Sequence, residues 1–114
     1  MPDCLFCAIV AGDIPANQVL ESDRMLAFRD INPQAPTHVL VIPKEHHRDV
    51  AALAKAGGDL LDELIAQAHE VARKEGVSET GYRVVFNTGG DAGQTVLHAH
   101  AHVLGGRPMS WPPG

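Results

Sequence analysis

Apolar residues recur along the chain with two different periods, one typical of helices and one typical of strands. The helical period is clearest over residues 59–75, where apolar positions recur three and four residues apart. Acidic residues lie near the start of this segment, basic residues lie near its end, and Gly76 follows it. We therefore predict a long amphipathic helix over 59–75, with an apolar stripe formed by Leu60, Leu61, Leu64, Ile65, Ala68, Val71 and Ala72.

A second, shorter helix is predicted near the N-terminus. Asp3 has a side chain suited to the N-cap of a helix over residues 4–11, and Gly12 is suited to end it. Apolar residues within this segment recur at helical spacing, at Leu5, Phe6, Ile9 and Val10.

The other apolar segments have the residue types of strands. Segments 18–20 and 25–28 are separated by a polar turn and predict a hairpin. The nearly all-apolar segment 37–42 predicts a central strand, and segments 82–87 and 95–104 predict two more. Strands and helices do not alternate regularly, so we expect an α+β fold with an antiparallel five-stranded sheet, one long helix and one short helix.

Length and composition narrow the class of protein. The chain has 114 residues, which corresponds to a single domain over residues 1–114. Its formal net charge of −5 argues against a nucleic-acid polymer as partner, because such partners require a basic surface. No segment approaches the roughly 18 apolar residues of a membrane span, and the first residues do not resemble a signal peptide. With only two cysteines, we expect a cytoplasmic protein without a membrane partner.

Three of the seven histidines alternate with apolar residues near the C-terminus. In a strand, His98, His100 and His102 would share one face, and the opposite face would pack on the core through Leu97, Ala99, Ala101 and Val103. Three imidazoles on one face could bind Zn²⁺, as in a hydrolase with three histidine ligands. Alternatively, one imidazole could attack phosphorus as a nucleophile while its neighbours bind the phosphate. The spacing by itself does not separate these two hypotheses.

A glycine-rich turn over residues 87–93 precedes the three histidines and is followed by Gln94 and Thr95. Glycines allow the backbone to approach a ligand closely, so that its N–H groups can point at an anion. The turn lacks the Gly-Lys-Ser/Thr ending of a P-loop, which argues against an ordinary NTPase. Next to three histidines it predicts a small phosphate pocket.

The run His98-Ala-His-Ala-His-Val-Leu resembles the pattern of the histidine-triad (HIT) superfamily. The segment from Asp30 to His38, the tripeptide Gly93-Gln94-Thr95 and the tail over 105–114 are similar to its Hint branch. The similarity extends from about residue 6 to residue 114. It implies a HIT-like fold that forms a homodimer through sheet and helix and binds purine nucleoside monophosphates and phosphoramidates.

The resemblance also implies roles for individual residues. His100 would attack the α-phosphate of a nucleoside phosphoramidate or aminoacyl adenylate, forming a nucleotidyl-histidine that water hydrolyses without a cofactor. His102 would contact the phosphate, the His98 carbonyl would hold the other ring nitrogen of His100, and His38 would polarise this network. Thr95 stands where the Hint branch usually has Ser, and it keeps the hydroxyl group.

Further residues would bind the nucleotide by the same resemblance. Asp30 would bond the ribose, Phe28 and Ile31 would lie near the base, and Trp111 would reach the site of the neighbouring subunit. The phosphate side would be lined by Asn87, Gly93, Gln94 and Thr95.

Cys4 and Cys7 form a Cys-x-x-Cys pair, which is half of a zinc site. The pair could equally be two small apolar residues or a redox pair. His46 and His98 could complete a Cys₂His₂ site. Some bacterial histidine-triad proteins with these features carry a structural zinc, whereas other Hint members lack the cysteines, so the mechanism does not require the metal.

Other functions remain open on sequence alone. They are a nucleotide-binding regulatory module with incidental hydrolysis, a metallohydrolase that uses the triad as zinc ligands, and a hydrolase of dinucleoside polyphosphates. Outside the triad, His69 lies opposite the apolar stripe of the long helix and is predicted to be solvated.

Overall fold

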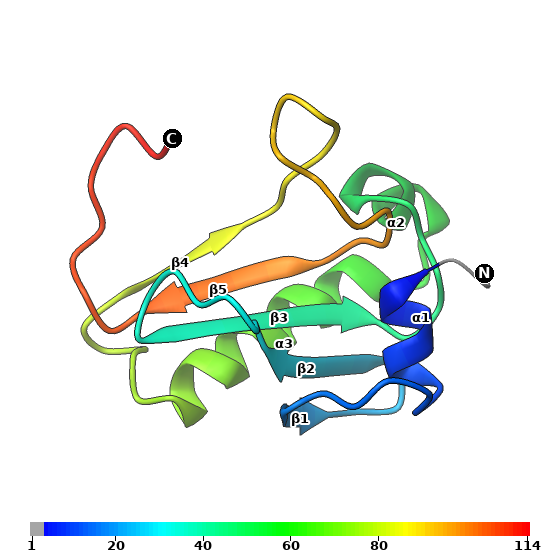
Figure 1. Cartoon of the computed structure of the whole chain (residues 1–114), viewed down its shortest axis with the longest axis horizontal. Helices are drawn as coiled ribbons and strands as arrows, with labels where there is room; N and C mark the ends of the chain where they lie inside the picture. Colours follow the sequence, from blue (N-terminus) through cyan, green and yellow to red (C-terminus); the bar gives the residue numbers. More distant parts are fainter. Residues whose placement is uncertain (1–3) are drawn as a thin grey trace.

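The computed structural model describes residues 4–114. Five strands form one antiparallel sheet in the order β1-β2-β3-β5-β4 (Figure 1). This arrangement confirms the predicted α+β fold and its five-stranded sheet. The strands are β1 (Gln18–Glu21), β2 (Met25–Arg29), β3 (Thr37–Pro43), β4 (Tyr82–Val85) and β5 (Ala101–Gly105).

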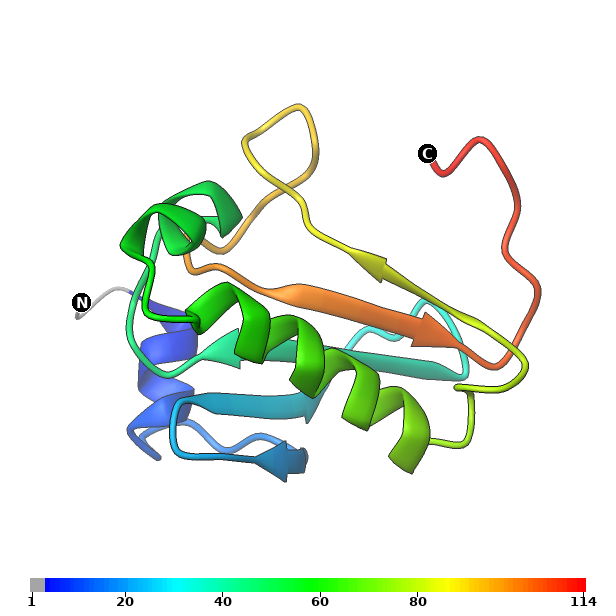
Figure 2. The same ribbon diagram turned by 180° about the vertical axis from the view of Figure 1, so that it is seen from behind.

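Helices cover both faces of the sheet. The long helix α3 (Leu60–Lys74) crosses one face, as Figure 2 shows. The short helix α1 (Leu5–Val10) packs on the other face, where Phe6 and Ile9 are buried against β2 and β3. Because successive strand residues point to opposite faces, Val39 and Val41 of β3 join the core beneath α3. None of the helices in residues 4–114 is long and apolar enough to cross a membrane.

The structure contains a third helix, α2 (Val50–Ala56), which the sequence pattern did not predict. The segment is rich in alanine, and Leu53 is its one buried residue, so it has no apolar stripe to reveal a helical period. Its N-terminus is nevertheless well capped, because the Asp49 side chain accepts a 2.9 Å hydrogen bond from the Ala52 N–H. The expectation of one long and one short helix was therefore wrong by one short helix.

The two predicted helices are confirmed with small differences. The apolar stripe predicted for α3 was wrong at one position, because Ile65 is 49% exposed. Cys4 is the N-cap of α1, and its Sγ accepts a 3.3 Å hydrogen bond from the Cys7 N–H. The predicted cap, Asp3, lies outside the described residues.

The last strand is shorter than predicted, and this changes the description of the triad. β5 begins at Ala101, so His102 is the one triad histidine within a strand. Ala99 is buried as expected, but Leu97 is 46% exposed. The segment before β5 leaves the sheet because its polar groups bond to the loop after β3, for example through a 2.7 Å bond from Ala99 N–H to the His47 carbonyl.

Candidate active site

Two histidines from neighbouring strands meet on the face of the sheet opposite α3. In the antiparallel register of β3 and β5, Leu40 is opposite His102 and His38 is opposite Leu104. His38 and His102 are therefore diagonal neighbours on one face, a distance that long side chains can bridge. Their facing nitrogens, His38 Nε2 and His102 Nδ1, lie 2.9 Å apart.

Backbone contacts determine which nitrogens of this pair carry protons. The Gln34 N–H donates a 3.0 Å hydrogen bond to His38 Nδ1, so that nitrogen is unprotonated. In the neutral ring, His38 Nε2–H then donates to His102 Nδ1. His102 is left with its proton on Nε2, which makes this atom a hydrogen-bond donor.

His100 has the opposite tautomer. Its Nδ1–H donates a 2.7 Å hydrogen bond to the His98 carbonyl, which leaves a lone pair on Nε2. The side chain is 9% exposed, and the Phe6 ring packs edge-on against it with the ring centroids 5.0 Å apart. Phe6 therefore forms part of the site, although its sequence pattern predicted only a buried helix position. The predicted zinc site, which joins Cys4 and Cys7 to His98, was the sequence signal that places α1 beside the triad.

Burial keeps these imidazoles neutral at neutral pH. It lowers the pKa of His102 to about 4, with further lowering from the neighbouring His100 and His38. Burial also lowers the pKa of His100 and of His38. A neutral His100 is the form with a nucleophilic lone pair.

Asp30 follows β2 and lies beside the histidine pair. Its Oδ2 is 3.4 Å from His38 Nε2, and this negative charge partly opposes the lowering of the His38 pKa by burial. With His38 neutral, the contact is between a carboxylate and a ring dipole rather than between two ions. The Asp30 Oδ1 accepts a 2.8 Å bond from the Asn32 N–H, which orients the carboxylate.

The side chain of Gln94 holds the glycine-rich turn in place. Its Oε1 accepts a 3.0 Å bond from Gly89 N–H. Its Nε2 donates to the Arg48 carbonyl at 2.9 Å and to the Val96 carbonyl at 3.1 Å. Gln94 was predicted to line the phosphate side, and its side-chain polar atoms are engaged with the backbone instead.

The remaining predicted nucleotide-binding residues lie on several different elements and differ in burial. Phe28 is buried in β2, with its ring centroid 5.5 Å from that of Phe6. Ile31 is fully exposed, and Trp111 is 80% exposed with its ring 6.0 Å from Arg83 Cζ. Three residues at the glycine-rich turn have exposed or half-buried positions: Asn87, Gly93 and Thr95.

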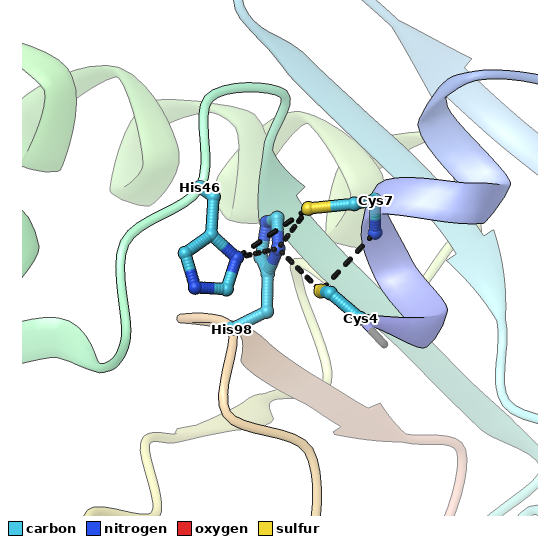
Figure 3. A group of neighbouring side chains, drawn as sticks. All are labelled: Cys4, Cys7, His46 and His98. Atoms are coloured by element: carbon cyan, nitrogen blue, oxygen red, sulfur yellow. Dashed lines mark hydrogen bonds between the residues drawn. The ribbon is translucent and has the colours of Figure 1, made fainter. Parts of the chain in front are cut away.

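A second cluster brings together the four predicted metal ligands (Figure 3). Cys4 Sγ and Cys7 Sγ lie 3.3 Å and 3.5 Å from His98 Nδ1, and His46 Nδ1 lies 3.2 Å from the same atom. All four ligand atoms lie within 4.8 Å of one another. The cluster joins α1, the loop after β3 and the segment before β5.

The chemistry of these donors fits a zinc ion. His98 Nε2 donates a 2.8 Å bond to the Pro43 carbonyl, so the Nδ1 lone pair faces the cluster. Burial and the neighbouring Cys4 raise the pKa of the Cys7 thiol, and a divalent cation would reverse this effect. Two thiolates and two imidazoles are a usual donor set for structural zinc.

The triad itself does not assemble as a three-histidine metal site. Among residues 4–114, His98 belongs to the cysteine cluster, whereas His102 groups with Asp30 and His38. In that second group the His38 and His102 nitrogens are joined by a hydrogen bond between neutral rings. The geometry therefore argues against the metallohydrolase hypothesis.

Comparison with known proteins gives the family. A sequence model of the HIT domain matches residues 11–109. The chain belongs to the HIT family. The solved structure of a HIT family hydrolase from Legionella pneumophila is similar to this HIT chain with a TM-score of 0.94 and 51% identity, covering 98% of this chain and 100% of that one.

Two further relatives of this HIT chain have informative names. A 14 kDa zinc-binding protein from Zea mays is 50% identical over 113 residues, covering 96% of this chain and 87% of the relative. The adenylylsulfatase HINT1 of Arabidopsis thaliana is 46% identical over 114 residues, covering 96% of this chain and 76% of the relative.

Proposed function

We propose that this HIT protein, as a single domain over residues 1–114, hydrolyses the P–N bond of purine nucleoside 5′-phosphoramidates. Aminoacyl adenylates are proposed as a related substrate class. The observation that carries the proposal is the 2.7 Å bond from His100 Nδ1–H to the His98 carbonyl. It leaves Nε2 of a neutral imidazole as the nucleophile, next to His102 with a donor on its own Nε2.

In the first step, His100 Nε2 attacks the α-phosphorus. A P–N bond to the histidine forms, the substrate P–N bond breaks, and the amine leaves with a proton from solvent; the attacking water of the second step returns a proton to solvent. With an aminoacyl adenylate, the P–O bond breaks and a carboxylate leaves without needing a proton. The ring of His100 gains positive charge, which the His98 carbonyl stabilises through the Nδ1–H bond. His102 Nε2–H donates to a phosphate oxygen, and His38 maintains this tautomer.

In the second step, water attacks the phosphorus of the nucleotidyl-histidine. The product is a nucleoside monophosphate, and His100 is regenerated with its lone pair. Both steps depend mainly on positioning and charge stabilisation, which backbone amides of the glycine-rich turn and the Thr95 hydroxyl would supplement. No metal or organic cofactor takes part in either step.

The nucleoside would lie between the β2–β3 loop and α1. Asp30 is proposed to bond the ribose hydroxyls, and Phe28 and Ile31 to lie near the base. The full exposure of Ile31 leaves its side chain accessible to a base, in agreement with this role. Asn87, Gly93 and Gln94 are proposed to form the phosphate side, Gln94 by holding the turn through its side chain and its backbone N–H.

We propose a structural zinc held by Cys4, Cys7, His46 and His98, supported by the donor geometry and by the zinc-binding maize relative. Metal analysis of protein purified without chelator tests this directly. We expect about one zinc ion per chain, bound tightly enough to survive dialysis. Zinc near zero in wild type would remove the proposal, and Cys4→Ser/Cys7→Ser is the matched control for adventitious metal.

We also propose a homodimer. β4 is an edge strand of the sheet, and its residue Val84 is only partly buried. On α3, Ile65 is exposed. A second copy could pair with this edge and cover these apolar groups, and Trp111 is then proposed to reach the neighbouring site. Light scattering should give twice the chain mass, and a monomer would contradict the proposal.

The hydrolase is tested with adenosine 5′-phosphoramidate in buffer without added metal, using protein that was not stripped with chelator. We expect turnover by wild type, a loss of about 10³-fold or more in His100→Ala, and AMP binding that is largely retained. His69→Ala, which removes an exposed histidine of α3, is the matched control and should retain full activity. Unchanged turnover in His100→Ala would contradict the role assigned to this residue.

One comparison favours a second substrate class for the same site. The Arabidopsis relative is named an adenylylsulfatase, so adenylyl sulfate should be assayed beside the phosphoramidate. Assays with these two substrates and with dinucleoside polyphosphates, together with AMP binding, also distinguish the proposed hydrolase from the two alternatives, a dinucleoside polyphosphate hydrolase and a regulatory module. The first would prefer dinucleoside polyphosphates, and the second would bind AMP without processing any of these substrates.

A further inference from the structure

We propose that the Cys/His cluster positions the nucleophile, and that the peptide unit between His98 and Ala99 transmits this effect. The inference rests on the role proposed above for His100. The carbonyl of this peptide accepts the 2.7 Å bond from His100 Nδ1, and its N–H donates a 2.7 Å bond to the His47 carbonyl. Because C=O and N–H of a planar peptide move together, rotation of this unit breaks both bonds.

The side chain of His98 is a second restraint on the same peptide. It is completely buried, and its Nε2 donates a 2.8 Å bond to the Pro43 carbonyl. Its Nδ1 faces the two cysteine sulfurs and His46. The ring is thus held at both nitrogens, which fixes the Cα position from which the carbonyl points to His100.

All of these restraints come from two short segments: the end of β3 with the loop that follows it, and α1 with its N-cap. Residues 43–47 supply the Pro43 and His47 carbonyls and the His46 ring, while α1 supplies Cys4 and Cys7. Thiol contacts to a ring nitrogen are weak, whereas a divalent cation bonded to all four donors would join the two segments to His98. The metal cluster and the nucleophile therefore share one residue, His98, whose ring serves the first and whose carbonyl serves the second.

Disrupting the cluster should affect catalysis more than substrate binding. The His98 carbonyl stabilises the charge that develops on His100, so its misalignment raises the barrier of the chemical step. We expect kcat to fall about 10–100-fold when the cysteine ligands are removed, with KM changed less than about threefold, as for other residues that orient a catalytic group.

The test compares zinc-loaded wild type, wild type stripped with chelator, and Cys4→Ser/Cys7→Ser. For each, kcat and KM are measured, and NMR of protein labelled with ¹⁵N records the Nδ1–H of His100 and the amide of Ala99 without substrate. We expect a protected His100 Nδ1 proton in the zinc-loaded protein. In the other two forms this proton and the Ala99 amide should exchange faster with solvent. Ala8→Ser is the matched control, because it adds a serine to α1 outside the cluster.

Identical His100 and Ala99 signals in loaded and stripped wild type overturn the proposal, as does wild type that takes up no zinc. If the double variant fails to fold, the loaded and stripped wild type provide the comparison. The NMR signals can be recorded without turnover, so a failure of the proposed hydrolase activity can be told apart from a failure of the proposed positioning of His100. A protein inactive on every substrate contradicts the hydrolase, while the zinc-dependent protection of His100 is still measured.

Discussion

His38 and His102 face each other diagonally across β3 and β5, with 2.9 Å between His38 Nε2 and His102 Nδ1. The direction of this bond follows from the backbone, because the Gln34 N–H already donates to His38 Nδ1. A main-chain amide thereby selects the tautomer of His102 through a second imidazole.

Replacing His38 with Phe should lower kcat while AMP affinity changes little. Without the donor from His38, the proton of His102 is free to occupy either nitrogen, and the fraction of rings with a donor on Nε2 falls. We expect a decrease in kcat of about 10–100-fold, comparable to the loss of other groups that orient a histidine. Steady-state kinetics and AMP calorimetry measure the two effects. A wild-type kcat in this variant would contradict the role of His38 in keeping the His102 proton on Nε2.

Stability should fall as pH decreases from about 6.5 to about 4. Burial and neighbouring histidines lower the pKa of His102 from 6.5 to about 4, and burial lowers the pKa of His100 and His38. In this range the unfolded chain binds more protons than the folded chain, so acid favours unfolding. Urea denaturation of the Cys4→Ser/Cys7→Ser protein at several pH values measures the slope free of metal effects. His102→Gln in the same background should reduce the slope.

Replacing Phe6 with Ala should destabilise the protein and expose His100, the proposed nucleophile. Phe6 is 4% exposed and packs edge-on against both His100 and Phe28. We expect the free energy of unfolding to fall by about 3–5 kcal/mol for Phe6→Ala and by less than about 1.5 kcal/mol for Phe6→Leu. Chemical denaturation gives both values, and equal stability of the two variants would contradict the packing role of the ring.

Gln94 should affect substrate affinity through the glycine-rich turn. Gln94→Met keeps the approximate side-chain volume but removes the bonds to Gly89, Arg48 and Val96. Each lost bond is worth about 1 kcal/mol, so we expect KM to rise about tenfold or more. Gln94→Glu restores only the acceptor for Gly89 N–H. If Gln94→Met has the wild-type KM, the turn does not depend on this side chain.

Much of the fold could be read from local patterns. The long helix and the β1–β2 hairpin were predicted from apolar residues at regular spacing and from a polar turn. The central strand is buried on both faces, so its residues form a continuous apolar run. The helix α2 was missed because Leu53 is its single buried residue. The strand predicted over 95–104 was too long, since the Ala99 N–H bonds to the His47 carbonyl in the loop after β3 and the His98 ring bonds to the carbonyl of Pro43 at the end of β3.

By itself, the sequence determined the chemical groups of this protein: alternating imidazoles, two thiols and a glycine-rich turn, all fixed by residue type and spacing. Only the tertiary structure decided which nitrogen each imidazole presents. The proton of a neutral imidazole sits on the nitrogen that has an acceptor for it. For His98 that acceptor is the Pro43 carbonyl, 55 positions away along the chain, and His102 is oriented by His38, 64 positions away. Such partners meet only when the sheet is assembled.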